Sequence, residues 1–340
     1  MIRSRDYKDL AVFTIVQEEH EFIHPWINHY KKHVADPKDI HVLVHPPSSA
    51  AAQQCGSNEN TAWTLAQSLM STHHGVMTLP VHHASAFDHR WLAETIASFQ
   101  SFLLQSYEWV LFADIDEFVL PMSWESQDCP TLLDFIRSLG STPPAAVRAS
   151  GFEIIQQKDE PTLPAGLYSK GCNVNLSVGE LIADRKSWYR SNQYSKTILA
   201  NKPLRWEMGF HLVKGFAREI SVAEPSHSLT LVHLHRVDLE IALSRLRRSR
   251  SQRWAQVDIQ NQYGWQNRVD DDTFHTFWNS DSDTGQPLEP GRLSPIPLCL
   301  HTALRRGDYK KGHWANRFKS LRRKAATKFD SIKPLYFSGQ

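Results

Sequence analysis

Short apolar runs and amphipathic helical patterns alternate along the first part of the chain. Residues 11–16 form a run that is typical of a buried strand, and residues 40–44 form a second one. Between them, apolar side chains from Phe22 to Val34 recur at helical spacing, with Pro25 in the first turn, where proline is tolerated. A strand, a helix and a strand in this order predict two parallel strands.

The alternation continues up to a cluster of carboxylates. It predicts a helix that runs to Met70, a strand at residues 75–79, a long helix at residues 86–105 and a strand at residues 109–112. Repeated β-α units of this kind predict a Rossmann-like α/β fold with a mostly parallel sheet. No Gly-x-Gly-x-x-Gly sequence follows any of these strands, which argues against a dinucleotide cofactor.

Beyond Pro121 the pattern is less regular, and no internal repeat is present. The elements predicted there are a helix at residues 131–139, a strand at 146–155 that Gly151 interrupts, strands at 194–199 and 229–234, and a helix at 238–253 with five arginines over its last turns.

Asp114 and Asp116 directly follow one of the predicted buried strands. Carboxylates next to a core strand are costly unless they are paired, hydrogen-bonded or bound to a metal. The C-terminal end of a strand in an open α/β sheet is also where such sheets bind ligands. The carboxylate oxygens suit Mg²⁺ or Mn²⁺, which commonly bridge a protein to a diphosphate. A second Asp-x-Asp, residues 281–283, has no strand before it, and we interpret it as a solvated loop.

The composition is that of an ordinary globular protein, with 41% hydrophobic and 22% charged residues and a formal net charge of +2. Four widely separated cysteines without a C-x-x-C sequence predict a reduced, cytoplasmic protein that has no structural zinc site. No apolar run approaches the roughly 18 residues that span a bilayer, so we expect any membrane contact to be peripheral. The eleven tryptophans would suit a substrate cleft with aromatic walls.

The last forty residues are strongly basic, with eleven Lys or Arg against Asp308 and Asp330. One interpretation is a solvated basic helix at the chain end. The other is a patch for anionic lipid, a phosphorylated product or a polyanionic acceptor.

Several segments, in order, resemble GT-A-fold glycosyltransferases of the family 2-like and family 92-like type, which carry an Asp-x-Asp-Glu-Phe motif. The resemblance covers residues 10–250. The matching segments are Glu18-Glu19 with Trp26-Ile27 and His29, residues 109–118, Lys196-Thr197-Ile198-Leu199, residues 206–211, and residues 233–236 ahead of a helix.

This resemblance implies a GT-A domain at residues 1–255, followed by an extension at residues 256–340 with an acidic loop and a basic helical tail. It implies metal-dependent transfer of a sugar from a nucleotide-sugar donor to a hydroxyl of a glycan, lipid or small molecule. No specific nucleic-acid partner is expected. A divalent cation, Mn²⁺ or Mg²⁺, would offset the charge of the leaving diphosphate.

The same resemblance assigns roles to individual residues. Asp116 would hold the metal, and Asp114 would reach the metal through water or bind the ribose. His211 is the candidate for a further metal or diphosphate contact, and the alternative is a hydrogen-bonded core histidine beside aromatic residues. Lys196 and Glu18 are expected to contact the donor, Lys196 as a point charge beside a phosphate.

Two departures from the family pattern leave the donor nucleotide, UDP or GDP, open. The family usually has Asn-Glu where this chain has Glu18-Glu19, and often has Asp where this chain has His45.

An inverting reaction needs a base, and we expect Asp184 in that role because of its place ahead of His211, with Glu180 as the alternative. Asp184 could instead be a surface carboxylate paired to Arg185. A retaining reaction would not require such a base.

Two other functions are compatible with the sequence. A metal-dependent phosphohydrolase would use Asp114, Asp116 and the pair His233 and His235 around two ions. A non-catalytic protein would bind nucleic acid or a membrane through its basic C-terminus.

Overall fold

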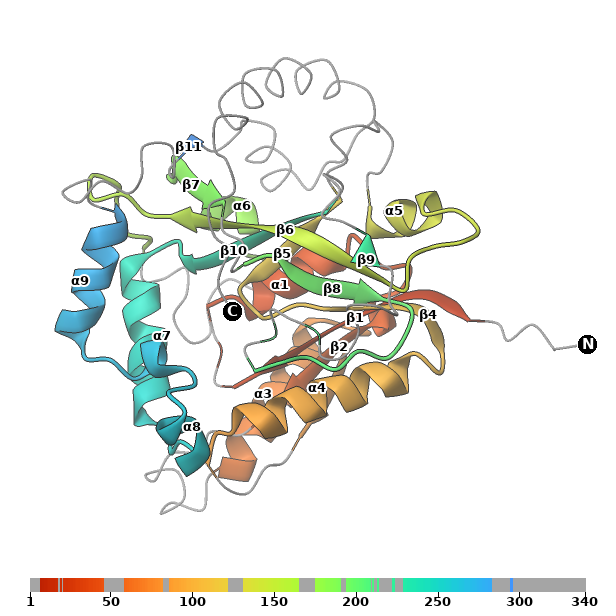
Figure 1. Cartoon of the computed structure of the whole chain (residues 1–340), viewed down its shortest axis with the longest axis horizontal. Coiled ribbons are helices and arrows are strands. Elements are labelled where there is room, and N and C mark those ends of the chain that lie inside the picture. Colours follow the sequence, from red (N-terminus) through yellow and green to blue (C-terminus); the bar gives the residue numbers. More distant parts are fainter. Residues whose placement is uncertain are drawn as a thin grey trace, which may run out of the picture.

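The structure is a computed structural model of the 340-residue chain (Figure 1). The expected α/β class is confirmed, because a mixed sheet lies between helices. The residues that the structure describes are 7–17, 19, 21–45, 58–81, 86–121, 131–164, 175–190, 194–208, 210, 213, 222–223, 229–282 and 294–295.

One half of the sheet is parallel and follows the strand order β3-β2-β1-β4. Val12 lies opposite Ile40 on one side of β1 and opposite Leu111 on the other. Helices cover both faces of such a sheet, so its strands are apolar throughout instead of alternating. The four strands are β1 (Lys8–Val16), β2 (Ile40–Val44), β3 (Met77–Pro80) and β4 (Tyr107–Phe112).

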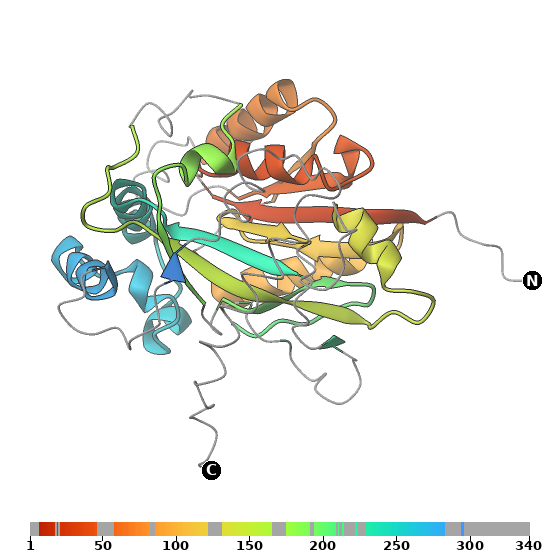
Figure 2. The same cartoon turned by 90° about the horizontal axis from the view of Figure 1, so that it is seen from above.

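Helices α1 (Ile23–Tyr30) and α3 (Asn58–Thr72) cover one face of the parallel strands, and α4 (His89–Leu103) covers the other (Figure 2). Val12 of β1 belongs to the core that contains α1 and α3, whereas its neighbour Phe13 belongs to the core that contains α4. The long helix starts later than the predicted residue 86, because Asp88 caps it by accepting a hydrogen bond from the Arg90 amide at 2.8 Å.

The other half of the sheet is mixed. β8 (Lys196–Ala200) runs antiparallel between β4 and β6 (Ala146–Ile155). β10 (Thr230–Arg236) runs parallel to β6 and antiparallel to β5 (Glu117–Leu120), a strand that the hydrophobic pattern did not predict. The smaller elements are η1 (Pro37–Asp39), α5 (Leu132–Ser138), α6 (Val178–Leu181), β7 (Ser187–Arg190), β9 (Val222–Ala223) and β11 (Ser294–Pro295).

The prediction that Gly151 interrupts its strand is wrong, because β6 is continuous through it. The glycine instead allows a close approach of two backbones. A Cβ at this position would lie 2.1 Å from the carbonyl carbon of Tyr194, a distance that no side chain can occupy. Gly151 therefore lets the segment ahead of β8 lie against β6.

Four helical elements follow β10 and stand at one end of the sheet (Figure 1). They are α7 (Leu239–Ser251), α8 (Gln256–Gln260), η3 (Trp265–Asn267) and α9 (Asp271–Ser282). His89 Nδ1 lies 2.9 Å from Asp258 Oδ2, and Arg247 Nη2 lies 2.7 Å from Asp271 Oδ2, so α8 and α9 both contact the preceding part of the chain.

Asp281 and Ser282 belong to the last turn of α9. The prediction that this Asp-x-Asp lies in a loop is therefore wrong for these two residues. The basic tail, residues 301–340, lies outside the described residues. Among the residues that are described, no helix combines the length and the hydrophobicity needed to cross a bilayer.

Candidate active site

The C-terminal ends of β1 and β4 lie side by side, since Phe13 pairs with Phe112. The chain leaves β1 toward α1 on one face of the sheet and reaches β4 from α4 on the other face. Such a reversal in the strand order opens a crevice at the carboxyl ends of the strands, where open α/β sheets bind ligands. Glu19 follows β1, and Asp114 and Asp116 follow β4, so carboxylates line this crevice from both strands.

Lys196 lies between two carboxylates at the end of β4. Its Nζ is 2.5 Å from Asp114 Oδ2 and 2.6 Å from Glu117 Oε1. The register explains the contact, because β8 pairs Leu199 with Leu111 in an antiparallel ladder, and three further steps bring Lys196 opposite Asp114. Burial alone would lower the pKa of Lys196, but the charges of Asp114 and Glu117 raise it, so the ammonium stays charged.

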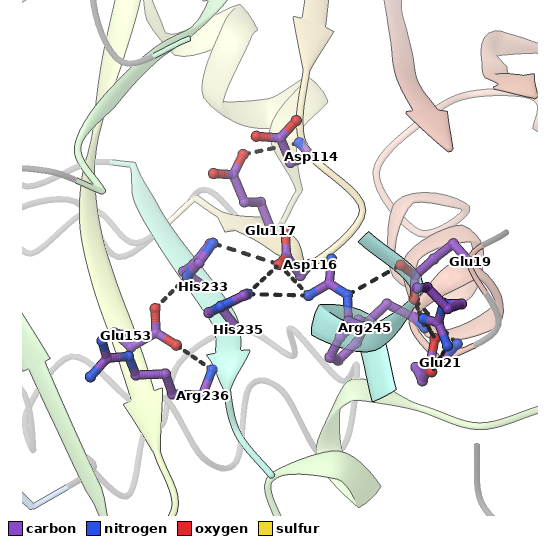
Figure 3. A network of polar contacts seen from close by, with 12 residues as sticks. Glu19, Glu21, Asp114, Asp116, Glu117, Glu153, His233, His235, Arg236 and Arg245 are labelled. Atoms are coloured by element: carbon purple, nitrogen blue, oxygen red, sulfur yellow. Dashed lines mark hydrogen bonds and ion pairs between the residues drawn. The ribbon is translucent and has the colours of Figure 1, made fainter. Parts of the chain in front are cut away.

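Asp116 is buried and surrounded by basic side chains (Figure 3). Arg245 Nη1 lies 2.6 Å from Asp116 Oδ2, and the imidazole nitrogens His233 Nε2 and His235 Nδ1 both lie 3.7 Å from it. Burial would raise the pKa of Asp116, but the charges of Arg245 and then His233 hold it well below its usual range. Asp116 is therefore an anion at neutral pH.

His233 lies in this cluster because β10 pairs with β5 and places His233 opposite Glu117 of β5. Its Nδ1 contacts the buried Glu153, whose other oxygen accepts a hydrogen bond from the Arg236 amide at 2.7 Å. The ring of Tyr194 stacks on His233 with centroids 4.6 Å apart. Burial would lower the pKa of His233, but the charges of Glu153 and Asp116 raise it to about 9. His233 is thus a second fixed cation beside Asp116.

Two further carboxylates connect the end of β1 to α7. Arg245 Nε lies 3.3 Å from Glu19 Oε2, and Arg248 donates to both oxygens of Glu21 at 2.7 Å. Burial raises the pKa of Glu19 to about 8. Burial acts in the same direction on Glu21, but the hydrogen bond from Arg248 outweighs it and lowers that pKa to about 2.

Several of these groups line a cavity of about 480 Å³. Its polar lining residues include Glu19, Asp114, Asp116, Lys196, His233, His235 and Arg245. Its aromatic lining residues include Phe87, Phe210, Trp254, Phe274 and Trp278. A ligand that carries both a charged group and a flat or apolar group would fit these walls. The expectation of an aromatic-walled cleft is in keeping with this lining.

The structure brings together three of the predicted site residues, Asp114, Asp116 and Lys196. It does not bring Asp184 to them, since Asp184 is exposed and is not among the side chains that line the cavity. Its neighbour Arg185 is buried and pairs with Asp238 at 3.1 Å.

The alternative base Glu180 lies in the capping box of α6, where it accepts from the Ser177 amide at 2.7 Å. Glu18 and His211 lie outside the described residues.

Arg245 and Arg248 line the cavity, and the sequence pattern does not identify them. In the sequence they belong to a run of arginines that is typical of an exposed helix end. One local signal exists for Arg245, because it stands four residues after the buried Ile241 and so lies on the inward face of α7. The partner carboxylates of both arginines are more than one hundred residues away, and no local pattern identifies them.

The donor set fits a divalent cation that arrives with its substrate. Within the part of the chain that the structure describes, no three His, Cys, Asp or Glu side chains are placed to hold a metal. However, Mg²⁺ that accompanies a diphosphate is usually bound by only one or two carboxylates plus phosphate oxygens and water. Asp116 and Asp114 meet that lesser requirement, although Arg245 and Lys196 already contact them.

No protein-family model and no curated protein matches this chain. Among solved structures, residues 1–349 of TarS from S. aureus are 12% identical over 54% of this chain and 48% of that one, with a TM-score of 0.26. The chain thus spans about half the length of that structure. The mannosyltransferase PcManGT from Pyrobaculum calidifontis, solved with GDP-Man and Mn²⁺, is 12% identical over 95% of this chain and 82% of that one, with a TM-score of 0.33. At these TM-scores the likeness assigns no function to the chain.

Proposed function

We propose that the chain is a glycosyltransferase of the GT-A type that moves a sugar from a nucleotide-sugar donor to a hydroxyl acceptor. The observation that carries the proposal is the cluster of Asp114, Asp116, Lys196 and Arg245 at the crevice between β1 and β4. The proposal needs both the sheet topology and the Asp-x-Asp-Glu-Phe segment, because each of these features alone also occurs in proteins of other functions.

The proposed reaction requires positive charge beside the diphosphate that leaves the sugar. A nucleotide sugar reacts by losing a nucleoside diphosphate, which is a poor leaving group unless its developing charge is stabilised. Lys196, His233 and Arg245 are cations fixed on the cavity wall by buried carboxylates, so they need little reorganisation when the charge develops. Mn²⁺ or Mg²⁺, held by Asp116 and Asp114, would supply further charge to the same diphosphate.

The aromatic residues in the cavity lining support a role in holding the donor or acceptor. Phe87 packs on Trp254 with ring centroids 4.9 Å apart, and both line the cavity. Flat apolar faces of this kind pack against a nucleobase or the apolar face of a sugar ring. We propose a glycan or a lipid-linked sugar as the acceptor, the latter with the basic C-terminal tail in contact with an anionic membrane surface.

An inverting course with Asp184 as the base stays a prediction. The exposed position of Asp184 gives it no contact with the cavity wall, so the base would have to act on an acceptor that extends beyond the cavity. A retaining course would leave Asp184 without a catalytic role.

Binding of nucleoside diphosphates tests the proposal. We expect one diphosphate from a panel that includes UDP and GDP to raise the melting temperature of the full chain, and Mn²⁺ to increase that shift, because a ligand that binds only the native state stabilises it. The matching nucleoside without phosphates should give little shift. If no diphosphate changes the melting temperature with or without Mn²⁺, the proposal is wrong.

A phosphohydrolase is the second candidate, because His233 and His235 both lie 3.7 Å from Asp116. In that function His233 would have to give up its proton to bind a metal ion. The two functions differ in what they release. A phosphohydrolase would liberate inorganic phosphate from nucleotides or phosphomonoesters without a sugar acceptor, whereas a glycosyltransferase would leave the diphosphate intact.

A further inference from the structure

Arg245 occupies the position beside Asp116 where a divalent cation would be expected. It extends from the inner face of α7, and only 18% of its side chain is exposed. Its Nη1 contacts Asp116 at 2.6 Å, its Nε faces Glu19 at 3.3 Å, and its guanidinium lies over the ring of Phe22 at 5.1 Å. The Arg245 guanidinium therefore bridges the side chains of Glu19 and Asp116, which follow β1 and β4 (Figure 3).

We infer that Arg245 is the counter-ion of Asp116 and competes with a divalent cation for this carboxylate. When the cation binds, the Arg245 guanidinium would leave Asp116 and bind the diphosphate of the donor instead. The last part rests on the proposed function, whereas the competition does not.

The competition follows from charge and space. A metal ion on Asp116 would stand about 2 Å from a carboxylate oxygen, next to the guanidinium that now contacts Oδ2. Two positive charges at such a short distance in a buried site repel each other strongly. The imidazoles of His233 and His235 are farther off, at 3.7 Å, so Arg245 is the group that must yield.

A diphosphate makes the exchange possible. The planar guanidinium binds phosphate oxygens with the same paired geometry that it uses for carboxylates. Arg245 would exchange one anion for another, while Arg248 keeps α7 attached to Glu21 through two hydrogen bonds of 2.7 Å. The helix need not move for the side chain to turn.

The direct test is titration of Mn²⁺ alone, without nucleotide, into the full chain, with the free ion measured by electron paramagnetic resonance. We expect Arg245→Gln to bind Mn²⁺ about ten-fold more tightly than the unmodified protein, the size of effect that one competing charge contact gives. Unchanged or weaker binding would overturn the competition. A merely structural Arg245 would lower the melting temperature without raising the affinity for Mn²⁺.

The control is Arg247→Gln. Arg247 lies on the same helix, is 55% exposed and pairs with Asp271 at 2.7 Å, so its loss should leave the Mn²⁺ affinity unchanged. Adding Asp116→Asn to Arg245→Gln should abolish the gain in affinity, which would locate the ion on Asp116. A gain that survives in the double variant contradicts the inference.

Arg245→Lys covers the case in which the glutamine variant does not fold. The lysine keeps the charge, but its point-like ammonium cannot contact Glu19 and Asp116 in the manner of a guanidinium. We expect it to bind Mn²⁺ a few-fold more tightly than the unmodified protein, and equal affinity would count against the competition.

The diphosphate half is tested separately, by titrating UDP and GDP at saturating Mn²⁺. We expect Arg245→Gln to bind the effective diphosphate about ten-fold more weakly, in spite of its tighter hold on Mn²⁺. Equal affinity would overturn the transfer of Arg245 to the diphosphate. If the unmodified protein binds no diphosphate, the proposed function and the transfer fail together, while the Mn²⁺ titration still decides the competition.

Discussion

At the scale of single residues, the sequence revealed the anions of the site more readily than the cations. Asp114 and Asp116 stand directly after an apolar strand, and that local pattern identifies them. Their partners Lys196 and Arg245 come from β8 and α7. These partners depend on strand register and helix placement, which short-range patterns do not encode. Lys196 was found only through the family resemblance.

The charge state of His233 gives a prediction for stability against pH. Its pKa rises from the ordinary 6.5 to about 9 in the folded protein. The stability from this group is therefore complete below pH 6.5 and is lost as pH rises through 9. We expect the free energy of unfolding to fall by up to about 3 kcal/mol more in the unmodified protein than in His233→Gln between these pH values.

Urea denaturation at pH 6.5 and pH 9 measures that difference directly. The comparison removes other groups that titrate in the same range, such as Glu19 with its pKa of about 8, because both proteins contain them. Parallel losses of stability in the two proteins would show that His233 is not held as an imidazolium.

At the scale of elements, the hydrophobic pattern predicted the parallel half of the sheet well. β1, β2, β4 and α4 all appear within a few residues of their predicted positions. The pattern does not predict β5 because its four residues directly follow the acidic turn and overlap with the Asp-x-Asp-Glu-Phe motif. The role of Gly151 is not evident from the sequence because its neighbour Tyr194 lies in a distant segment, just ahead of β8.

Two glycines offer a test of this interpretation of β6. In Gly151→Ala the new Cβ would meet backbone atoms of Tyr194 at 2.1 and 2.3 Å, so the segment ahead of Lys196 must shift. We expect a loss of at least about 3 kcal/mol in the free energy of unfolding, together with weaker binding of nucleoside diphosphates.

Gly140 is the matched control in this test. It follows α5 with a φ of +76° and no atom within 4 Å of an added Cβ, so Gly140→Ala should cost only about 1 kcal/mol of backbone strain. Its diphosphate binding should be unchanged. A Gly151→Ala protein as stable as the Gly140→Ala protein would mean that the two backbones are not in close contact.

At the scale of the whole molecule, α7 connects the end of β1 to the end of β4. Glu21 is buried, and its two oxygens accept hydrogen bonds from Arg248 at 2.7 Å. Arg248→Gln removes both of these hydrogen bonds from a buried carboxylate, which we expect to cost about 3–5 kcal/mol of unfolding free energy. Adding Glu21→Gln should recover part of the loss.

A double-mutant cycle on this pair, measured by urea denaturation, should give a coupling energy of about 1–3 kcal/mol. The exposed pair of Arg247, which lies on the same helix as Arg248, and Asp271 of α9 should show much weaker coupling. Additive effects of the Glu21 and Arg248 substitutions would mean that α7 is not attached to the sheet through this contact.

The central claim is that a nucleoside diphosphate departs from a sugar at Asp114 and Asp116, and its most direct measurement is diphosphate release from a panel of nucleotide sugars. We expect release from at least one donor, a fall of about 100-fold or more in Asp116→Asn, and no change in Asp9→Asn, whose carboxylate is exposed and pairs with Arg137 at 2.8 Å. Release from no donor with any hydroxyl acceptor, or full release in Asp116→Asn, would contradict the claim.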